Sequence, residues 1–152
     1  MGLIMGTVVI HAAGFAALLR AMMRLHVLSV SGFGRVTVTL IGVTCCLVLI
    51  HLAEISLWGV FYFRQGCLPD LETALYFSGG TYTTAGYGEL TLAPPWRMFG
   101  QLEALTGILM CGLSTGLFFA VVSRWIGNWV RSSADLAGHD ATPGAAGPRT
   151  RN

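Results

Sequence analysis

The sequence has 152 residues, of which 54% are hydrophobic and only 11% are charged, and its formal net charge is +2. This length allows roughly one domain, and the mean hydropathy of +0.67 is typical of a membrane-embedded protein and excludes an ordinary soluble one. The nine basic residues are all arginines and form no basic run. The chain therefore lacks the electrostatic footprint of a nucleic-acid-binding protein.

The four cysteines match no metal-binding spacing and predict no intrachain disulfide framework. Cys45, Cys46 and Cys111 fall inside apolar stretches, where a thiol behaves as a small hydrophobic group. Cys67 lies outside these stretches, which leaves open a disulfide between subunits.

The first apolar segment runs from Leu3 to Leu19, and Arg20 and Arg24 follow it. A secretory signal has its positive charge before the apolar stretch and a small-residue cleavage site after it. The order here is reversed, which predicts a retained transmembrane helix. The segment barely reaches the roughly 20 residues that a span needs, so a helix lying along the membrane surface is the alternative.

Residues 21–35 are expected to form a short cytoplasmic connection, because Gly32 and Gly34 interrupt helical structure. Together with the first helix, this connection makes residues 1–35 an N-terminal unit.

The longest apolar run is Val36–Phe63, and only His51 and Glu54 interrupt it. It predicts a second transmembrane helix. Four aromatic residues crowd its far end, as an aromatic belt at a membrane face would: Trp58, Phe61, Tyr62 and Phe63.

A short helix is predicted over Leu71–Tyr82, after a break at residues 65–69. Asp70 is placed to cap its N-terminus, and Glu72 in the first turn suits the positive end of the helix dipole. The helix is too short to cross a bilayer and lies between two spans. It should therefore enter the membrane, stop partway and lead directly into the segment Thr83–Glu89.

An extended connector at residues 90–95 follows, since Pro94 and Pro95 bar a helix there. The last span is expected at Met98–Ile126. Residues 36–130 then form one membrane domain. The remaining residues, 131–152, are rich in Ala, Gly, Ser, Thr and Pro and predict a disordered cytoplasmic tail.

The segment Thr84-Ala85-Gly86-Tyr87-Gly88-Glu89 has glycines on both sides of a tyrosine, and glycine adopts backbone angles closed to other residues. It resembles the filter of the pore-loop potassium channels, which reads Thr-Val-Gly-Tyr-Gly-Asp. The resemblance covers roughly residues 36–126 and implies an all-α membrane protein. Its pore domain would consist of an outer helix, a pore helix, a filter loop and an inner helix, with one extra N-terminal transmembrane helix.

The resemblance also implies the ion sites. Four chains around one axis would stack rings of carbonyl oxygens that replace the hydration shell of a potassium ion. The ion ligands would be the carbonyls of Thr84, Ala85, Gly86 and Tyr87, with the Thr84 hydroxyl, and Gly88 completes the filter. Potassium is the permeant ion, no other cofactor is expected, and the partners are the lipid bilayer and three further copies of the chain.

Three departures from the family pattern bear on selectivity. Ala85 replaces Val or Ile, and Glu89 replaces Asp at the outer mouth. Many relatives carry a Glu on the pore helix where this chain has Gly80, beside Gly79. These changes leave open a general monovalent cation pore as the alternative to a potassium-selective one.

Several side chains are candidates to support the filter. Tyr76 and Phe77 would brace it from behind, and Glu89 would act at its mouth. Glu54 and Glu103 lie within spans, where a carboxylate is expensive and functional by default, and one of them is expected to hydrogen-bond the pore helix or the filter. The alternative is that Glu54 pairs with His51 or with the first helix as simple packing.

Gating residues are suggested by residue type alone. Gly107 and Gly112 could let the inner helix bend, or they could be small residues that permit close helix contact. His51 is a candidate pH sensor and His11 a weaker one, and a satisfied buried histidine is the alternative for both. No helix carries a row of arginines, which argues against steep voltage gating.

The arginines predict the topology, because cytoplasmic loops carry an excess of positive charge. Three spans would place most of them on one side: Arg20, Arg24, Arg35, Arg124, Arg131, Arg149 and Arg151. The filter entrance is then outside and the C-terminus is cytoplasmic, in what we expect to be a bacterial inner membrane.

The expected function is a homotetrameric potassium-selective channel that passes ions passively, with no small-molecule substrate other than monovalent cations. A non-selective cation channel, a non-conducting membrane subunit and a potassium-transporter component are the alternatives. No set of nucleophile, base and orienting residue predicts an enzyme.

Overall fold

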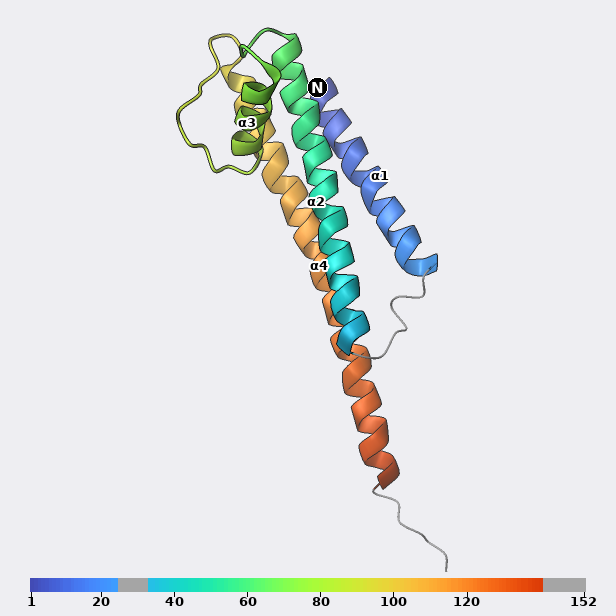
Figure 1. Ribbon diagram of the computed structural model, residues 1–152. Helices are drawn as coiled ribbons and strands as arrows, with labels where there is room; N and C mark the ends of the chain where they lie inside the picture. Colours follow the sequence, from blue (N-terminus) through green and yellow to red (C-terminus); the bar gives the residue numbers. More distant parts are fainter. Residues whose placement is uncertain (25–32, 141–152) are drawn as a thin grey trace, which may run out of the picture.

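The computed structural model describes residues 1–24 and 33–140, and this part of the chain contains helices and no strand. Three long helices lie side by side, and one short helix sits at one end of them beside an open loop (Figure 1). The helices are α1 (Gly2–Arg24), α2 (Phe33–Arg64), α3 (Leu71–Tyr82) and α4 (Arg97–Asp140). The predicted all-α fold with a short helix between two spans is confirmed.

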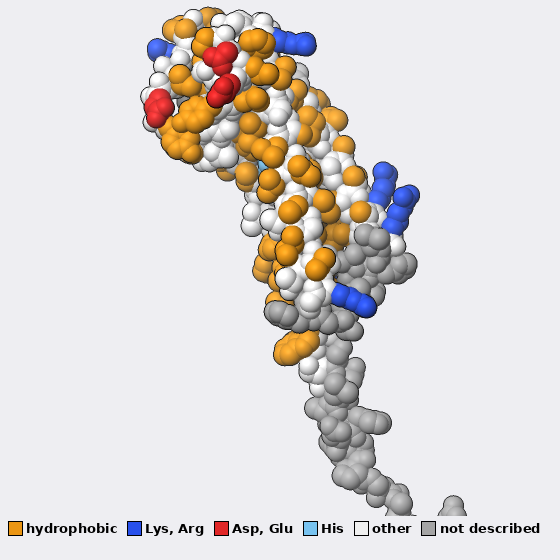
Figure 2. Space-filling view, viewed as in Figure 1, with side chains coloured by type: hydrophobic (Ala, Val, Ile, Leu, Met, Phe, Trp, Pro, Cys, Tyr) orange, Lys and Arg blue, Asp and Glu red, His pale blue; other side chains and the backbone are white. Residues whose placement is uncertain are grey.

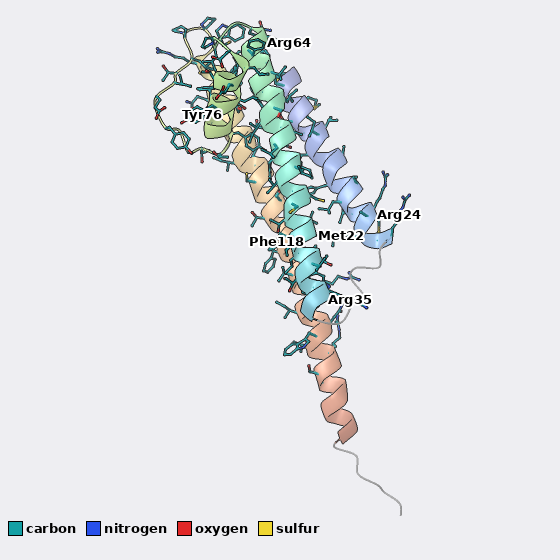
Figure 3. All side chains as sticks on the ribbon, in the orientation of Figure 1. Met22, Arg24, Arg35, Arg64, Tyr76 and Phe118 are labelled. Carbon is teal, nitrogen blue, oxygen red and sulfur yellow. The ribbon has the colours of Figure 1, made fainter. Side chains whose placement is uncertain are left out.

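Each of the three long helices has an apolar stretch that can cross a membrane by length and composition, of 23, 31 and 35 residues, where about 20 are needed. Hydrophobic side chains cover the visible face of the long helices, and acidic side chains gather at the end that carries α3 (Figure 2). Arg64 lies at that end, whereas Arg24 and Arg35 lie at the far end of their helices (Figure 3). The protein is an integral membrane protein built from helices.

Helices α1 and α4 both run antiparallel to α2. Side-chain contacts advance along one helix as they retreat along the other: Thr7 with Trp58 and His11 with Glu54 for α1, and Tyr62 with Glu103 and His51 with Ser114 for α4. Helix α2 is therefore the central helix, in contact with each of the others.

Two apolar clusters hold the helices together, one toward each end of α2. The first joins α1, α2 and α4 through Leu18, Met22, Val43, Leu47, Val121 and Trp125. The second lies beneath α3 and contains Trp58, Tyr62, Leu68, Ala74 and Leu92. His51 and Glu54 lie between the two clusters along α2, so a buried polar layer of this helix is placed next to the end of α3.

Helix α3 begins and ends where the sequence predicts. The carboxylate of Asp70 accepts hydrogen bonds from the backbone N–H of Thr73 at 2.7 Å and from its hydroxyl at 2.8 Å, which is the geometry of an N-cap. These bonds favour the charged carboxylate and lower the pKa of Asp70. At the other end the N–H of Thr83 donates to the carbonyl of Gly79 at 3.1 Å, which closes the last turn.

The predicted connection at residues 21–35 is too long. Helix α1 continues to Arg24 and α2 begins at Phe33, so Gly34 lies inside the first turn of α2. A glycine there interrupts little, because the first four N–H groups of a helix have no intrahelical partner in any case. Gly32 and the rest of residues 25–32 lie outside the described residues.

Part of the predicted disordered tail is helical. Helix α4 runs to Asp140, so residues 131–140 belong to the inner helix. No proline occurs between residues 97 and 140, and once a helix has formed, each further residue adds a hydrogen bond without a new nucleation cost. Residues 141–152 lie outside the described part of the chain.

The predicted aromatic belt is also only partly correct. Trp58 and Tyr62 are 1% and 0% exposed and pack into the second apolar cluster. Their burial is tolerated because the N–H of Trp58 and the O–H of Tyr62 each have a buried hydrogen-bond partner. Phe63, at 43% exposed, faces outward.

Candidate functional site

The filter segment, Thr84–Glu89, leaves the C-terminal end of α3 and is exposed along its whole length in the single chain. Positive φ angles occur at alternate residues: 59° at Thr84, 50° at Gly86 and 78° at Gly88. Ala85 and Tyr87 have negative φ. Thr84 is β-branched, and a β-branched residue at positive φ is an outlier. Backbone strain of this kind clusters at functional sites.

The backbone hydrogen bonds of this segment orient its peptide groups. The N–H of Gly86 donates to the carbonyl of Gly80 in α3 at 3.0 Å. In a trans peptide the C=O and N–H point in opposite directions, so the carbonyl of Ala85 points away from α3. Alternation of the sign of φ is the backbone pattern that can turn successive N–H groups to one side. At Ala85, at least, a main-chain oxygen lies on the side away from the supporting helix.

Aromatic stacking holds the loop against α3. The rings of Tyr76 and Tyr87 stack with centroids 5.7 Å apart and an interplanar angle of 17°, and Tyr76 lies on the exposed side of α3 (Figure 3). Phe77 packs edge-on against Tyr62 of α2 at 5.4 Å. A Cβ at Gly80 would lie 3.5 Å from the Tyr87 ring, which is ordinary contact. Tyr76 therefore contacts the filter segment directly, and Phe77 ties α3 to α2.

Glu103 of α4 is fully buried between α2 and α3. It accepts a hydrogen bond from the hydroxyl of Tyr62 at 2.8 Å and one from Ser78 at 2.5 Å. The Ser78 hydroxyl also lies 2.8 Å from the carbonyl of Ile55. Glu103 thus joins three helices at the middle of α3, and whether this contact stabilises the filter remains a prediction.

Glu54 of α2 is the centre of a second buried network. Its Oε1 lies 2.9 Å from His11 Nδ1 of α1, and its Oε2 lies 3.1 Å from His51 Nδ1. Tyr82, the last residue of α3, donates its hydroxyl to the same Oε2. His51 continues the network to α4, with its Nε2 2.9 Å from Ser114 Oγ. Glu54 thus makes the contacts of both alternatives, with the first helix, His51 and α3, and a role in stabilising the filter stays a prediction.

His11, His51 and Glu54 are also the one group in the described part of the chain with the residue types and proximity of a metal site, with one ligand atom from each within 4.8 Å of the others. Two histidines and a carboxylate are zinc-type donors. The Nδ1 atoms of both histidines already lie within hydrogen-bond distance of the Glu54 carboxylate, so these contacts hold the three side chains together without an ion.

Gly107 lies where α4 meets the end of α3. A Cβ at this position would stand 2.1 Å from the carbonyl oxygen of Tyr82, so the close approach of the two helices requires glycine. Gly112 has nothing within 4 Å of such a Cβ. Of the two glycines considered for gating, only Gly107 is at a tight contact within the chain, and a role for either in gating stays a prediction.

The family described as Ion channel matches residues 48–124, from the middle of α2 to Arg124 of α4, which is just over half of the chain. The chain belongs to the ion channel family. The matched range includes α3, the filter segment and both buried glutamates. This ion channel is a passive path for ions across a membrane, and its family is one of channels rather than of enzymes. No curated protein and no solved structure matches the chain.

Sequence reasoning missed the hydroxyl partners of the two glutamates. Ser78 and Tyr82 both lie on α3, four residues apart, and each bonds one glutamate. Residues at i and i+4 share a helix face, so two hydroxyl groups at this spacing on a short helix were a usable signal that this face meets buried acceptors.

Loss of Glu103 should destabilise the channel. We expect Glu103→Leu to lower the unfolding temperature of the purified protein, because the buried hydroxyl of Tyr62 loses its acceptor, and a buried unsatisfied group costs about 1–3 kcal/mol. Glu103→Gln, which keeps an acceptor oxygen, should lose less. Ser123→Leu on the exposed side of α4 is the control and should change little. Equal unfolding temperatures for Glu103→Leu and Ser123→Leu would contradict the role of Glu103.

Proposed function

We propose that this ion channel is a potassium-selective channel and that four identical chains assemble around one axis to form its pore. The observation that carries the proposal is the backbone at and beside Gly86-Tyr87-Gly88: φ alternates in sign, and the N–H of Gly86 donates to Gly80 of α3, so that the carbonyl of Ala85 points away from α3. Rings of such carbonyls can replace the hydration shell of potassium. The ligands would be the carbonyls of Thr84 to Tyr87 with the Thr84 hydroxyl.

Exposure of the filter segment favours assembly. Tyr87 is 65% exposed in the single chain, and a hollow of about 470 Å³ lies between the segment and the start of α4, near Arg97 and Gln101. Non-helical backbone at membrane depth is tolerated only where protein buries it or where it lines a water-filled path. Copies of the chain around an axis through the carbonyls would meet both conditions, and each chain supplies a single filter segment.

The helix dipole of α3 agrees with a cation path. Its C-terminal end leads into the filter segment, and the last carbonyls of a helix carry a partial negative charge. In the proposed tetramer four such ends would face the inner mouth of the filter and favour a cation there.

The orientation follows from the arginines. Arg24 and Arg35 lie at the end opposite α3 (Figure 3), and the positive-inside rule places that end in the cytoplasm. The filter entrance would then face outward and the C-terminus inward.

A general monovalent cation pore is the second candidate, because Ala85 has less bulk than the Val or Ile usual in the family and Gly80 supplies no side-chain support behind Tyr87. Flux measurements on purified protein in liposomes separate the two. We expect potassium to enter loaded vesicles at least roughly tenfold faster than sodium, the ratio that a free-energy difference of about 1.4 kcal/mol produces.

Two other results of the flux experiment have distinct meanings, and a cross-linking experiment tests the assembly. Equal potassium and sodium flux would support the general cation pore. Absence of any flux, with the protein inserted and assembled, would contradict both candidates and favour a non-conducting subunit. Cross-linking in detergent should give four chains, and a monomer or dimer would contradict the tetramer.

A further inference from the structure

We infer that α1 positions the selectivity filter through the buried connection His11–Glu54–Tyr82, so that the N-terminal helix is part of the support of the pore. The inference rests on the proposed function in its claim about selectivity. It assigns His11 as a positioning residue for a filter that it does not touch.

The proton of His11 can be placed from its surroundings. The ring is 3% exposed, its Nδ1 lies 2.9 Å from Glu54 Oε1, and its Nε2 is buried without a hydrogen-bond partner. A buried N–H without an acceptor is costly, so the proton belongs on Nδ1 and Nε2 is the unprotonated nitrogen. His11 therefore donates to Glu54.

Glu54 connects this donor to the end of α3. The carboxylate is 0% exposed and accepts the hydroxyl of Tyr82, the final residue of the pore helix, two positions before Thr84. A buried charge needs several donors. Loss of the His11 donor should make Glu54 reorient toward its remaining partners, and Tyr82 is bonded to the same group.

The end of α3 has little freedom to absorb such a shift. The carbonyl of Tyr82 packs directly on Gly107 of α4, and the N–H of Thr84 donates to Thr81 at 3.0 Å. A displacement of the Tyr82 side chain should therefore also displace Thr84, the first residue of the filter segment, because no flexible loop separates the two residues.

The structure supplies a matched control in the same pair of helices. Thr7 of α1 accepts a hydrogen bond from Trp58 Nε1 of α2 at 3.0 Å, and both side chains are buried. This bond holds α1 on α2 just as His11 does, but it involves neither Glu54 nor Tyr82. Thr7→Val removes the acceptor and keeps the shape.

The test compares His11→Leu, His11→Asn and Thr7→Val in the full chain, by potassium and sodium flux in liposomes and by hydrogen–deuterium exchange of residues 83–89. We expect His11→Leu to lower the potassium-to-sodium flux ratio by roughly tenfold, within the range of coupling in hydrogen-bond networks, and to speed exchange. His11→Asn, whose amide places an N–H near the Nδ1 position, should restore both. Thr7→Val should change neither.

The double variant His11→Leu with Tyr82→Phe distinguishes loss of this connection from general misfolding. Tyr82→Phe alone removes the hydroxyl that Glu54 accepts and should lower the flux ratio as His11→Leu does. If one connection carries both effects, the variant with both substitutions is no worse than either alone. Additive losses in the double variant would overturn the inference. Equal effects of His11→Leu and Thr7→Val on the flux ratio and on exchange would also overturn it. Neither result would contradict the selectivity of the wild-type channel. A wild-type protein without selectivity would instead overturn the proposed function and, with it, this inference.

Discussion

Gly86→Ala is expected to abolish selective potassium flux. Gly86 has φ of 50°, and the left-handed region costs an L-residue roughly 1–2 kcal/mol because Cβ meets the backbone. That cost corresponds to roughly a tenfold change in an equilibrium per copy, and the proposed pore contains four copies at one level. Alanine should therefore turn the peptide before or after it and misdirect a ring of carbonyls. Potassium flux into liposomes measures the loss.

Gly66→Ala is the control for this prediction. Gly66 lies in the connection between α2 and α3, has φ of 65° and, like Gly86, has nothing within 4 Å of an added Cβ. The backbone strain of the two substitutions is therefore similar, but only one falls in the filter segment. We expect Gly66→Ala to reduce stability slightly and to leave the potassium-to-sodium flux ratio unchanged. Equal losses of selectivity in both variants would show that strain in general, and no special role of Gly86, is responsible.

Gly107→Ala is expected to have the largest effect on stability. The new Cβ would stand 2.1 Å from the carbonyl oxygen and 2.9 Å from the carbonyl carbon of Tyr82. These are backbone atoms at the end of a helix, so relief requires α3 and α4 to separate. Overpacking of this kind costs about 1–3 kcal/mol and occasionally more. The assembled channel should dissociate at a lower temperature, and its flux should fall.

This prediction also separates the two roles considered for Gly107. If Gly107 serves only as a hinge, alanine should alter channel opening and leave the dissociation temperature unchanged. Gly112→Ala is the matched control, with the same substitution five residues along α4 at a position with nothing within 4 Å. It should leave stability unchanged or raise it, since alanine is the better helix former by about 1 kcal/mol.

The elements of the fold could be predicted because each depends on local signals. Three apolar runs of sufficient length predict spans whatever the helices pack against, and Asp70 with the short segment after it predicts α3. The ends of α1, α2 and α4 were less accurate, because glycine and polar residues weaken a helix without ending it. The position of Gly34 inside α2 and the helical residues 131–140 are examples.

In the candidate site, too, features that depend on local sequence could be predicted and features that depend on helix packing could not. The filter segment could be predicted from Gly86-Tyr87-Gly88 because its proposed chemistry lies in the backbone, and glycine spacing controls the backbone directly. His51 could be named as a partner of Glu54 because it lies three residues earlier on the same helix, but the partner residues from other helices could not be identified. Neither His11 for Glu54 nor Tyr62 for Glu103 is close in sequence, and helical periodicity does not say which faces meet.

The amino-acid sequence by itself determined that this protein is helical and lies in a membrane, and it predicts a filter segment, since apolar length and glycine placement are properties of short stretches of chain. Only the tertiary structure decided that Glu54 links α1 to the end of α3, that Glu103 joins three helices, and that Gly107 is a contact point. The physical reason is that a buried carboxylate and a missing Cβ acquire their roles from the atoms that surround them, and those atoms are set by how the helices pack.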